Sequence, residues 1–494
     1  MTDINTNKKK DTSDSTQKTP TKFAIYLNEL IDESGESQKK ICERADVERT
    51  SLNKLLKGTR DKINYKDVQK LADYLNLTVD KRREYFRLYN LSFQGQDTYN
   101  NREAVRTLLN HLSSVKFVPT PPPVVDKLEF STMFPRGEYA IRNAIRNILI
   151  YEATHTDNAH FSLFVPSEFD ITQELIELWL SGKDFTADSL LCFHSSQTDS
   201  VKNIQLLQSV IPLCLASRGK YCPYYFTEAY KSVSLSPMSY YIITPHYLVQ
   251  LSEDLAMAHI SENIEFINYY SESFGKLLEY CAPLTQCSSN IIEVLQEYIS
   301  GTAPDSLNVM MTQPCPGRYI TPEVIRKYMN NGTVPYKEMF NLVEQHFSVL
   351  RQIKGNYETV FTQKGLKDFI DTCTMADLPP QYVPPLEKKD IKQMLMYLYK
   401  EIEMGTVKGI IVKPSALQLP DCISICVSQN GLHIYTTNEF IYGAYCCNIH
   451  ITEKSLCNIF SDFMKPKSLE DNNLVYSKED TLNILKQHIS EMDA

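Results

Sequence analysis

The sequence predicts a multidomain protein in which an all-α N-terminal domain is followed by a larger α/β or α+β body. Its 494 residues exceed what one hydrophobic core usually holds, so two to four domains are expected. Up to about residue 117 the apolar residues recur at helical spacing, whereas strand-like and helix-like runs alternate after that point. Consecutive prolines in VPTPPPVV, residues 118–125, separate the two patterns and favour an extended, stiff spacer.

The predicted domain boundaries follow from these patterns. No internal repeat is evident. We expect a disordered tail (1–19), a helical domain (20–92), a helical connector (93–117), a proline-rich linker (118–125), an α/β sensor-like domain (126–288), and a helical segment with a second α/β or α+β unit (289–494).

The most informative stretch is Ser37–Arg60. Its apolar residues predict two short helices that share one core and are broken near Asp46 by a tight turn, which is the pattern of a helix-turn-helix. The second helix, roughly Arg49 to Lys57, would end at Gly58. It would expose a small, partly basic face of the width that the DNA major groove accepts. The apolar residues of the pattern are Ile41, Ala45, Val47, Leu52, Leu55 and Leu56.

This segment resembles the Cro/CI-type (XRE) helix-turn-helix family of bacterial and phage regulators, over about residues 22–91. Gln38 matches the start of the first motif helix, and Ile41-Cys42 match the family's Leu-Ala pair. Val47 matches its turn valine, and Gly58 its closing glycine.

Three positions depart from the family pattern. Asp46 replaces the usual turn glycine, Glu48 stands where a Ser or Thr cap is common, and Leu56 replaces a frequent glutamate. Aspartate tolerates the left-handed backbone conformation, so the turn itself remains possible.

The resemblance implies a site for double-stranded DNA. Gln38 would bond a phosphate near the start of the first motif helix. Because one such helix contacts few bases, a homodimer on two half-sites about one helical turn apart is expected. An unknown small-molecule or protein effector would act through the body. The residues expected to reach base edges, or to lie beside those that do, are Arg49, Thr50, Asn53, Lys54 and Lys57.

Charge and composition favour a soluble, cytoplasmic protein. The net charge is −9, but residues 18–93 hold 16 Lys and Arg against 12 Asp and Glu, so only the N-terminal domain is basic. We find no apolar run long enough to span a membrane and no signal peptide, and we expect no membrane partner. The 13 cysteines form no CxxC pair, so reduced thiols and no metal site are expected.

The sequence contains none of the common catalytic or nucleotide-binding motifs. No phosphate loop, dinucleotide-binding glycine motif, nucleophile elbow or HExxH occurs. A phospholipase-type HxK motif is also absent, because Ser196 and Leu248 stand two residues after His194 and His246. We therefore expect no catalytic residue, no cofactor and no enzymatic activity.

A hairpin predicted around Pro245, followed by a helix containing Phe274 and Leu277, is loosely similar to inactive phospholipase-D-like domains and other sensor domains. Aromatic rings with polar tips can line a small-molecule pocket, although ordinary sheet packing explains them as well. The candidates, among 30 tyrosines, are Tyr221, Tyr224, Tyr225, Tyr240 and Tyr241.

Together these patterns indicate a sequence-specific DNA-binding transcriptional regulator with a signal-sensing or oligomerisation body. Two alternatives stay open. One is an antitoxin-like DNA-binding partner of another protein. The other is a signal-processing enzyme whose helix-turn-helix serves protein contacts, and a cluster of ionisable residues meeting in the body would favour it.

Overall fold

The computed structural model describes residues 19–492 except 61–62, 116, 119–123, 167–168, 195–199, 228–237, 289, 302–305, 330–335, 354, 377, 379–381, 422, 429 and 438–445. The chain forms two compact units, Met1–Asn100 and Asn101–Ala494, and the division falls within one helix, α6 (Gln96–Ser114). The expected disordered tail falls almost wholly outside the described residues, as do five of the eight residues of the proline-rich linker.

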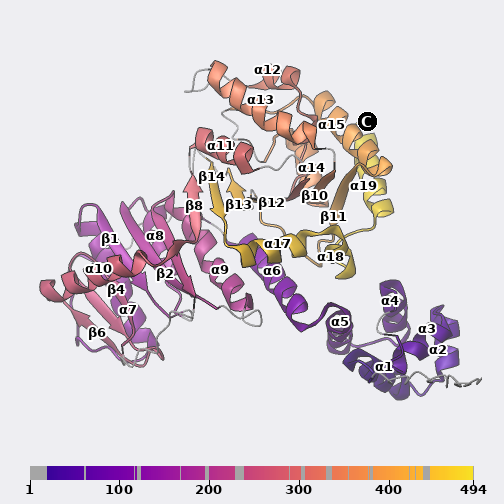
Figure 1. Ribbon diagram of the computed structural model, residues 1–494, viewed down its shortest axis with the longest axis horizontal. Helices are drawn as coiled ribbons and strands as arrows, with labels where there is room; N and C mark the ends of the chain where they lie inside the picture. Colours follow the sequence, from indigo (N-terminus) through magenta and orange to yellow (C-terminus); the bar gives the residue numbers. More distant parts are fainter. Residues whose placement is uncertain are drawn as a thin grey trace, which may run out of the picture. The chain divides into compact units, whose positions relative to one another are not determined.

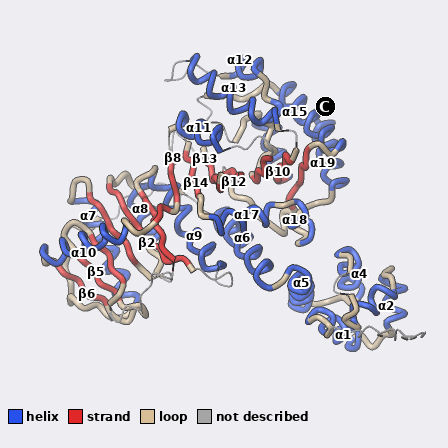
Figure 2. Tube along the Cα trace, viewed as in Figure 1, coloured by secondary structure: helices blue, strands red, loops and turns tan. Residues whose placement is uncertain are grey.

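Among its described residues the N-terminal unit contains helices and no strand (Figures 1 and 2). Besides the start of α6 these are α1 (Lys22–Glu33), α2 (Gln38–Ala45), α3 (Arg49–Leu56), α4 (Tyr65–Tyr74) and α5 (Val79–Gln94).

The turn between α2 and α3 has the backbone that its sequence predicted. Ser37 caps α2 by accepting a hydrogen bond from the Lys40 amide, and Asp46 ends α2 in the left-handed conformation at φ 52°. Gly58, which follows the C-cap residue of α3, has φ +71°. The predicted start of α2 at Gln38 and the predicted span of α3 are confirmed within one residue. Edge-to-face contacts of Phe23 with Tyr85 and Tyr89 tie α1 to α5 in the core of this unit.

The larger unit contains two seven-stranded mixed sheets, so the protein is a multidomain α+β protein. Its first half, up to β7, comprises α7 (Glu138–His155), β1 (Ala159–Phe164), α8 (Thr172–Leu180), β2 (Phe185–Phe193), α9 (Ser200–Ser217), β3 (Tyr221–Thr227), β4 (Tyr240–Ile243), β5 (Leu248–Leu251), β6 (Ala258–Ser261), α10 (Ile264–Leu278) and β7 (Ala282–Pro283).

The first sheet has the order β6-β5-β4-β1-β2-β3-β7. Strands β1, β2 and β3 are parallel and joined by α8 and α9, whereas β4, β5 and β6 form an antiparallel meander beside β1. The hairpin predicted around Pro245 is confirmed as the β4–β5 connection, where the backbone of Thr244 and Tyr247 is hydrogen-bonded.

The second half comprises β8 (Thr285–Ser288), α11 (Ile291–Gly301), β9 (Ser306–Met310), η3 (Gly317–Tyr319), α12 (Pro322–Tyr328), α13 (Tyr336–Gln352), β10 (Asn356–Thr362), α14 (Gln363–Thr372), α15 (Lys388–Met404), β11 (Val407–Val412), β12 (Ile423–Ser428), β13 (Gly431–Thr436), β14 (Cys447–Ile451), α17 (Lys454–Met464), α18 (Pro466–Asp471) and α19 (Lys478–Glu491). Strands β12 and β13 form an antiparallel hairpin, and Gly431 has φ +143° where it enters β13.

The second sheet, in the order β11-β10-β9-β12-β13-β14-β8, repeats the plan of the first. Three parallel strands (β9, β10, β11) lie beside an antiparallel meander (β12, β13, β14), and in both halves the meander joins the first of the parallel strands. The larger unit therefore contains an internal structural repeat that local sequence patterns do not reveal.

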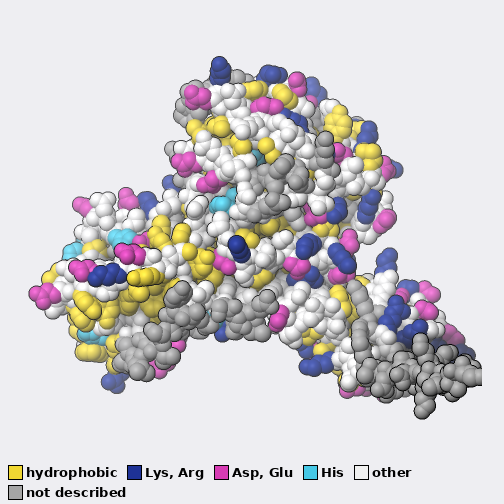
Figure 3. Space-filling model, viewed as in Figure 1, with side chains coloured by type: hydrophobic (Ala, Val, Ile, Leu, Met, Phe, Trp, Pro, Cys, Tyr) yellow, Lys and Arg dark blue, Asp and Glu magenta, His cyan; other side chains and the backbone are white. Residues whose placement is uncertain are grey.

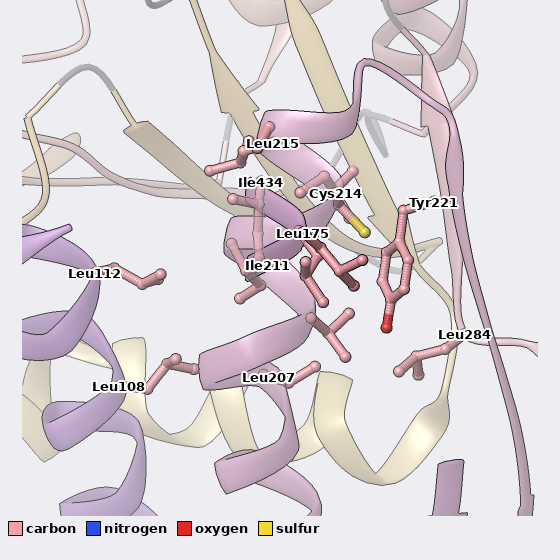
Figure 4. Packing of buried hydrophobic residues seen from close by; sticks show 14 of the residues in the cluster. Leu108, Leu112, Leu175, Leu207, Ile211, Cys214, Leu215, Tyr221, Leu284 and Ile434 are labelled. Carbon is pink, nitrogen blue, oxygen red and sulfur yellow. The ribbon is translucent and has the colours of Figure 1, made fainter. Parts of the chain in front are cut away.

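One hydrophobic core connects the two halves. Helices α6, α9 and α17 lie between the sheets (Figure 1), and their apolar side chains pack together with the inner faces of both. Leu108 and Leu112 of α6, Ile211 of α9 and Ile434 of β13 belong to this cluster (Figure 4). Arg102 also pairs with Asp462 of α17 at 2.8 Å. The later part of α6, which the sequence suggested as a connector, is thus part of the body.

Candidate active site

The predicted DNA-contacting residues gather on α2 and α3. Arg49, Thr50 and Lys54 lie on the exposed face of α3, and Asn53 beside them is half-buried. Lys57 follows the end of this helix and is exposed, whereas Gln38, the first residue of α2, is half-buried. Their contact with DNA stays a prediction.

Acidic side chains accompany the basic ones around these helices. Lys40 pairs with Glu36 at 2.6 Å, and Lys70 pairs with Asp46, in the turn before α3, at 2.7 Å. Figure 3 shows Lys and Arg interspersed with Asp and Glu over this unit. The surface beside α3 is therefore mixed in charge.

The five candidate tyrosines do not line one cavity. They lie on neighbouring strands, but Tyr221, Tyr225 and Tyr240 pack into the core shared with the second half, while Tyr241 packs under α10 and Tyr224 lies against the same cluster. Burial raises the pKa of Tyr241 to about 12. Successive side chains of a strand point to opposite faces of the sheet, so the tyrosines are divided between its two faces. Their main role is to pack the sheet against its neighbours.

The structure instead brings together two ionisable residues that are 94 positions apart, Glu152 and His246. Glu152 lies on the inner face of α7 and is fully buried. His246 lies at the tip of the β4–β5 hairpin, and its side chain is 63% exposed. The imidazole Nδ1 lies 3.1 Å from one Glu152 oxygen, and the backbone N–H of His246 donates to the other oxygen at 3.0 Å.

Two hydroxyl groups complete the surroundings of this carboxylate. Thr156 Oγ1 donates to Glu152 at 2.8 Å, and Thr244 Oγ1 lies 3.2 Å from its other oxygen. Each carboxylate oxygen therefore faces one hydroxyl and one nitrogen donor, which compensates a buried negative charge. The hairpin tip is held in turn, because the Tyr247 amide donates to Thr244 Oγ1 at 3.1 Å.

This geometry fixes the tautomer of His246. Since Nδ1 donates to Glu152, Nε2 carries the free lone pair and is directed away from the carboxylate. An imidazole oriented in this way presents Nε2 to a reacting group, and the buried carboxylate holds the ring in place.

Glu152 is the charged residue that the structure records in direct contact with His246. Burial raises the pKa of the adjacent Tyr247, and the negative charges of Glu262 and Glu152 raise it further. Leu248, the residue at the lysine position of an HxK motif, begins β5 and is fully buried. The site therefore has an oriented base without the lysine that this motif would supply.

The second half has a corresponding carboxylate on α11, the helix before its first parallel strand. Glu297 accepts a hydrogen bond from Ser288 Oγ and another from Asn448 Nδ2 at 2.6 Å. Asn448 lies 3.3 Å from Nδ1 of His433, whose ring stacks on that of His450 at a centroid distance of 4.3 Å. His433 is only 2% exposed, and burial lowers its pKa to about 4.

Sequence patterns missed Glu152 and noted His246 only as a histidine without the lysine of an HxK motif. The available signal was a carboxylate on the apolar stripe of α7, in line with Ile145, Ile148 and Leu149. Among the described residues, no group of three or more His, Cys, Asp or Glu side chains is arranged to hold a metal ion. The search of those residues also finds no helix with the length and apolar character needed to cross a membrane.

No family model and no curated protein matches this sequence. Among solved structures, the chain is similar to the phosphatidylserine synthase of Haemophilus influenzae Rd KW20, with 8% identity and a TM-score of 0.21 over 80% of this chain and 98% of that one.

That protein is an enzyme and not a transcriptional regulator. This finding contradicts two of our expectations, that the chain is a DNA-binding transcriptional regulator and that it is not an enzyme, and both are corrected here. The identity and TM-score are too low to transfer a substrate or an active site, so the chemistry of the chain is inferred from its own residues.

Proposed function

We propose that this chain is a signal-processing enzyme in which His246 acts as a general base. The observation that carries the proposal is the fully buried Glu152, which holds an exposed imidazole through its Nδ1 and leaves Nε2 facing outward. In the reaction, Nε2 takes the proton of an attacking water or hydroxyl, and Glu152 acts as the positioning residue.

The charge around His246 favours an uncharged substrate. The carboxylate of Glu152 lies directly behind the His246 ring, so a phosphate group at His246 would be brought close to a negative charge. A carboxylic ester carries no charge and needs a base to activate the attacking oxygen. We therefore propose hydrolysis or transfer of an ester group.

Ester hydrolysis by the full-length protein tests this proposal. Rates are measured with p-nitrophenyl acetate and p-nitrophenyl butyrate, and with bis-p-nitrophenyl phosphate as the charged comparison. We expect hydrolysis of the two carboxylic esters, and a fall of about 10²–10⁴-fold for His246→Asn. Glu152→Gln should also lose activity, because it no longer stabilises the imidazolium.

His259→Asn is the matched control. His259 lies on β6 of the same sheet, hydrogen-bonded to Gln250 at 2.9 Å and stacked on Phe134, and among the described residues no carboxylate pairs with its ring. Its replacement should leave the rate unchanged. Equal rates for the wild type and His246→Asn would contradict the proposal.

We further propose that the N-terminal unit contacts a partner protein. The mixed charges beside α3, including the Asp46–Lys70 pair, support a surface for another folded protein. Affinity purification of the tagged full-length chain should recover the partner. Arg49→Glu combined with Lys54→Glu should abolish its recovery while ester hydrolysis is unchanged, and equal recovery with the double variant would contradict this role.

A further inference from the structure

Two thiols meet at the junction between the two halves of the larger unit. Cys214 lies in the last turn of α9, the helix that leads into β3, and Cys287 lies on β8, an edge strand of the second sheet. The hydroxyl oxygen of Thr285 on β8 lies 3.5 Å from Cys214 Sγ and 3.7 Å from Cys287 Sγ. The two thiols are also hydrogen-bonded to each other. Segments far apart in the sequence thus bring two sulfur atoms and one hydroxyl into a single cluster.

The two thiols differ in their access to solvent. Cys214 is fully buried, and its side chain points toward the ring of Tyr221 on β3 (Figure 4). Cys287 is partly exposed. A small solute therefore meets the thiol of Cys287 before that of Cys214.

The cluster also distinguishes the two thiols by their acidity. Hydrogen bonds from Cys214 and Thr285 lower the pKa of Cys287 below its ordinary value, against the opposing effects of burial and of the Glu297 carboxylate. Burial raises the pKa of Cys214 well above its ordinary value, and its hydrogen bond to Cys287 raises it further. Cys287 is therefore the thiol that more readily becomes a thiolate, which is the reactive form, while Cys214 stays protonated.

From this geometry we infer that Cys287 and Cys214 form a peroxide-reactive pair, in which Cys287 is oxidised first and Cys214 then closes a disulfide between the two halves. The Cys287 thiolate attacks hydrogen peroxide and the O–O bond breaks, which leaves a sulfenic acid on Cys287. The leaving hydroxide takes the proton that Cys287 had released and becomes water. The Cys214 sulfur then attacks the Cys287 sulfur, the S–O bond breaks, and the Cys214 proton goes to the leaving hydroxide. Overall, two thiols are oxidised to one disulfide and one peroxide is reduced to two molecules of water.

The disulfide ties β8 to α9 and so fixes one sheet against a helix of the other half. Because it closes the chain from β3 to β7 into a loop, it also restricts the unfolded state. Both thiols are free in the structure, which therefore describes the reduced form. The assignment is independent of the ester hydrolysis proposed for His246.

Peptide mapping of the full-length protein tests the pair. The protein is reduced, treated with a small excess of hydrogen peroxide, unfolded in the presence of N-ethylmaleimide and digested. We expect a cross-linked peptide pair that contains Cys214 and Cys287 and that dithiothreitol separates. Absence of this peptide pair, or a link from Cys214 to the nearby Cys447 in its place, would overturn the inference.

Single serine variants separate the roles of the two thiols. Cys214→Ser cannot close the disulfide, so the sulfenic acid on Cys287 should be trapped by dimedone. In Cys287→Ser, dimedone labelling of Cys214 should be lower by at least about tenfold, because that thiol is buried and protonated. Cys281→Ser is the matched control, since this partly buried thiol donates to the Leu277 carbonyl at 3.1 Å, and the variant should form the Cys214–Cys287 link as the wild type does.

Two results with the variants would contradict the assignment. Equal dimedone labelling of Cys214→Ser and Cys287→Ser would contradict the order of oxidation. Loss of the link in Cys281→Ser would show that the pair alone does not account for it. Circular dichroism melting verifies folding, and an alanine variant replaces a serine variant that does not fold. The peptide map of the wild type requires no substitution and tests the pair in every case.

Discussion

The two halves of the larger unit share the order of six strands but use it differently, and the seventh strand pairs with β3 in the first half and with β14 in the second. Each has three parallel strands beside an antiparallel meander, and each places a glutamate on the helix before its first parallel strand, Glu152 on α7 and Glu297 on α11. In the first half the glutamate orients an exposed histidine. In the second it holds Asn448 and Ser288, and the histidine behind them is buried.

The connections between the parallel strands differ as well. Single helices, α8 and α9, join β1, β2 and β3, whereas η3, α12 and α13 join β9 to β10, and α14 and α15 join β10 to β11. An apolar cavity lies against these additional helices. The same arrangement of strands thus exposes His246 to solvent in the first half and borders an apolar cavity in the second. The fold alone therefore determines neither feature.

The largest expected effect is on the two glutamates themselves, of which Glu152 is fully buried and Glu297 is partly exposed. Glu152→Leu removes the acceptor of the hairpin-tip amide and of the Thr156 hydroxyl, and one of two acceptors of the Thr244 hydroxyl, and should cost about 2–4 kcal/mol of unfolding free energy. Glu297→Leu removes an acceptor from only two side chains and should cost about 1–2 kcal/mol. Urea unfolding of both variants measures the two losses of unfolding free energy. A larger loss for Glu297→Leu than for Glu152→Leu would contradict the proposed difference between the two halves.

A second effect follows from the buried imidazole of the second half. The unfolded chain protonates His433 near its ordinary pKa of 6.5, but the folded chain does so only near a pKa of about 4. Because the unfolded state binds the proton first, this residue's contribution of about 3 kcal/mol is complete above pH 6.5 and is lost as the pH falls towards 4.

Urea unfolding at pH 7 and pH 5 tests the contribution of His433. His433→Gln should be less sensitive to this change by about 2 kcal/mol than the wild type. His450→Gln is the control. Burial is the main cause of the lowered pKa of His433, and His433 stays buried in this variant, so its pH sensitivity should resemble that of the wild type. Equal pH sensitivity of wild type and His433→Gln would show that the buried imidazole is not responsible.

Local chemistry explains which parts of the structure the sequence predicted. The limits of α2 and α3 follow from a capping serine, a turn aspartate and a glycine, and the β4–β5 hairpin follows from Pro245. Each of these signals acts within a few residues, so it can be recognised along the chain.

The candidate site and the repeat depend on contacts between distant segments. Glu152 and His246 meet only because β1 pairs with β4, which brings α7 next to the β4–β5 hairpin. Likewise, the strand order of each sheet is set by hydrogen-bond partners rather than by residue periodicity. The tyrosines illustrate the converse, since Tyr240 and Tyr241 are adjacent in sequence but face opposite sides of their sheet.

The smallest expected effect on stability is that of His246→Asn, and it distinguishes a catalytic role of this histidine from a structural one. The imidazole of His246 is largely exposed, and its backbone N–H, which any residue retains, still donates to Glu152. His246→Asn should therefore change the unfolding free energy by no more than about 1 kcal/mol, less than either glutamate replacement, while it lowers the rate of ester hydrolysis by about 10²–10⁴-fold. Denaturant unfolding and ester rates measured on the same preparation test this separation. A loss of stability as large as that of Glu152→Leu would mean that the pair serves to hold the hairpin, and the two halves would then differ in structure without differing in chemistry.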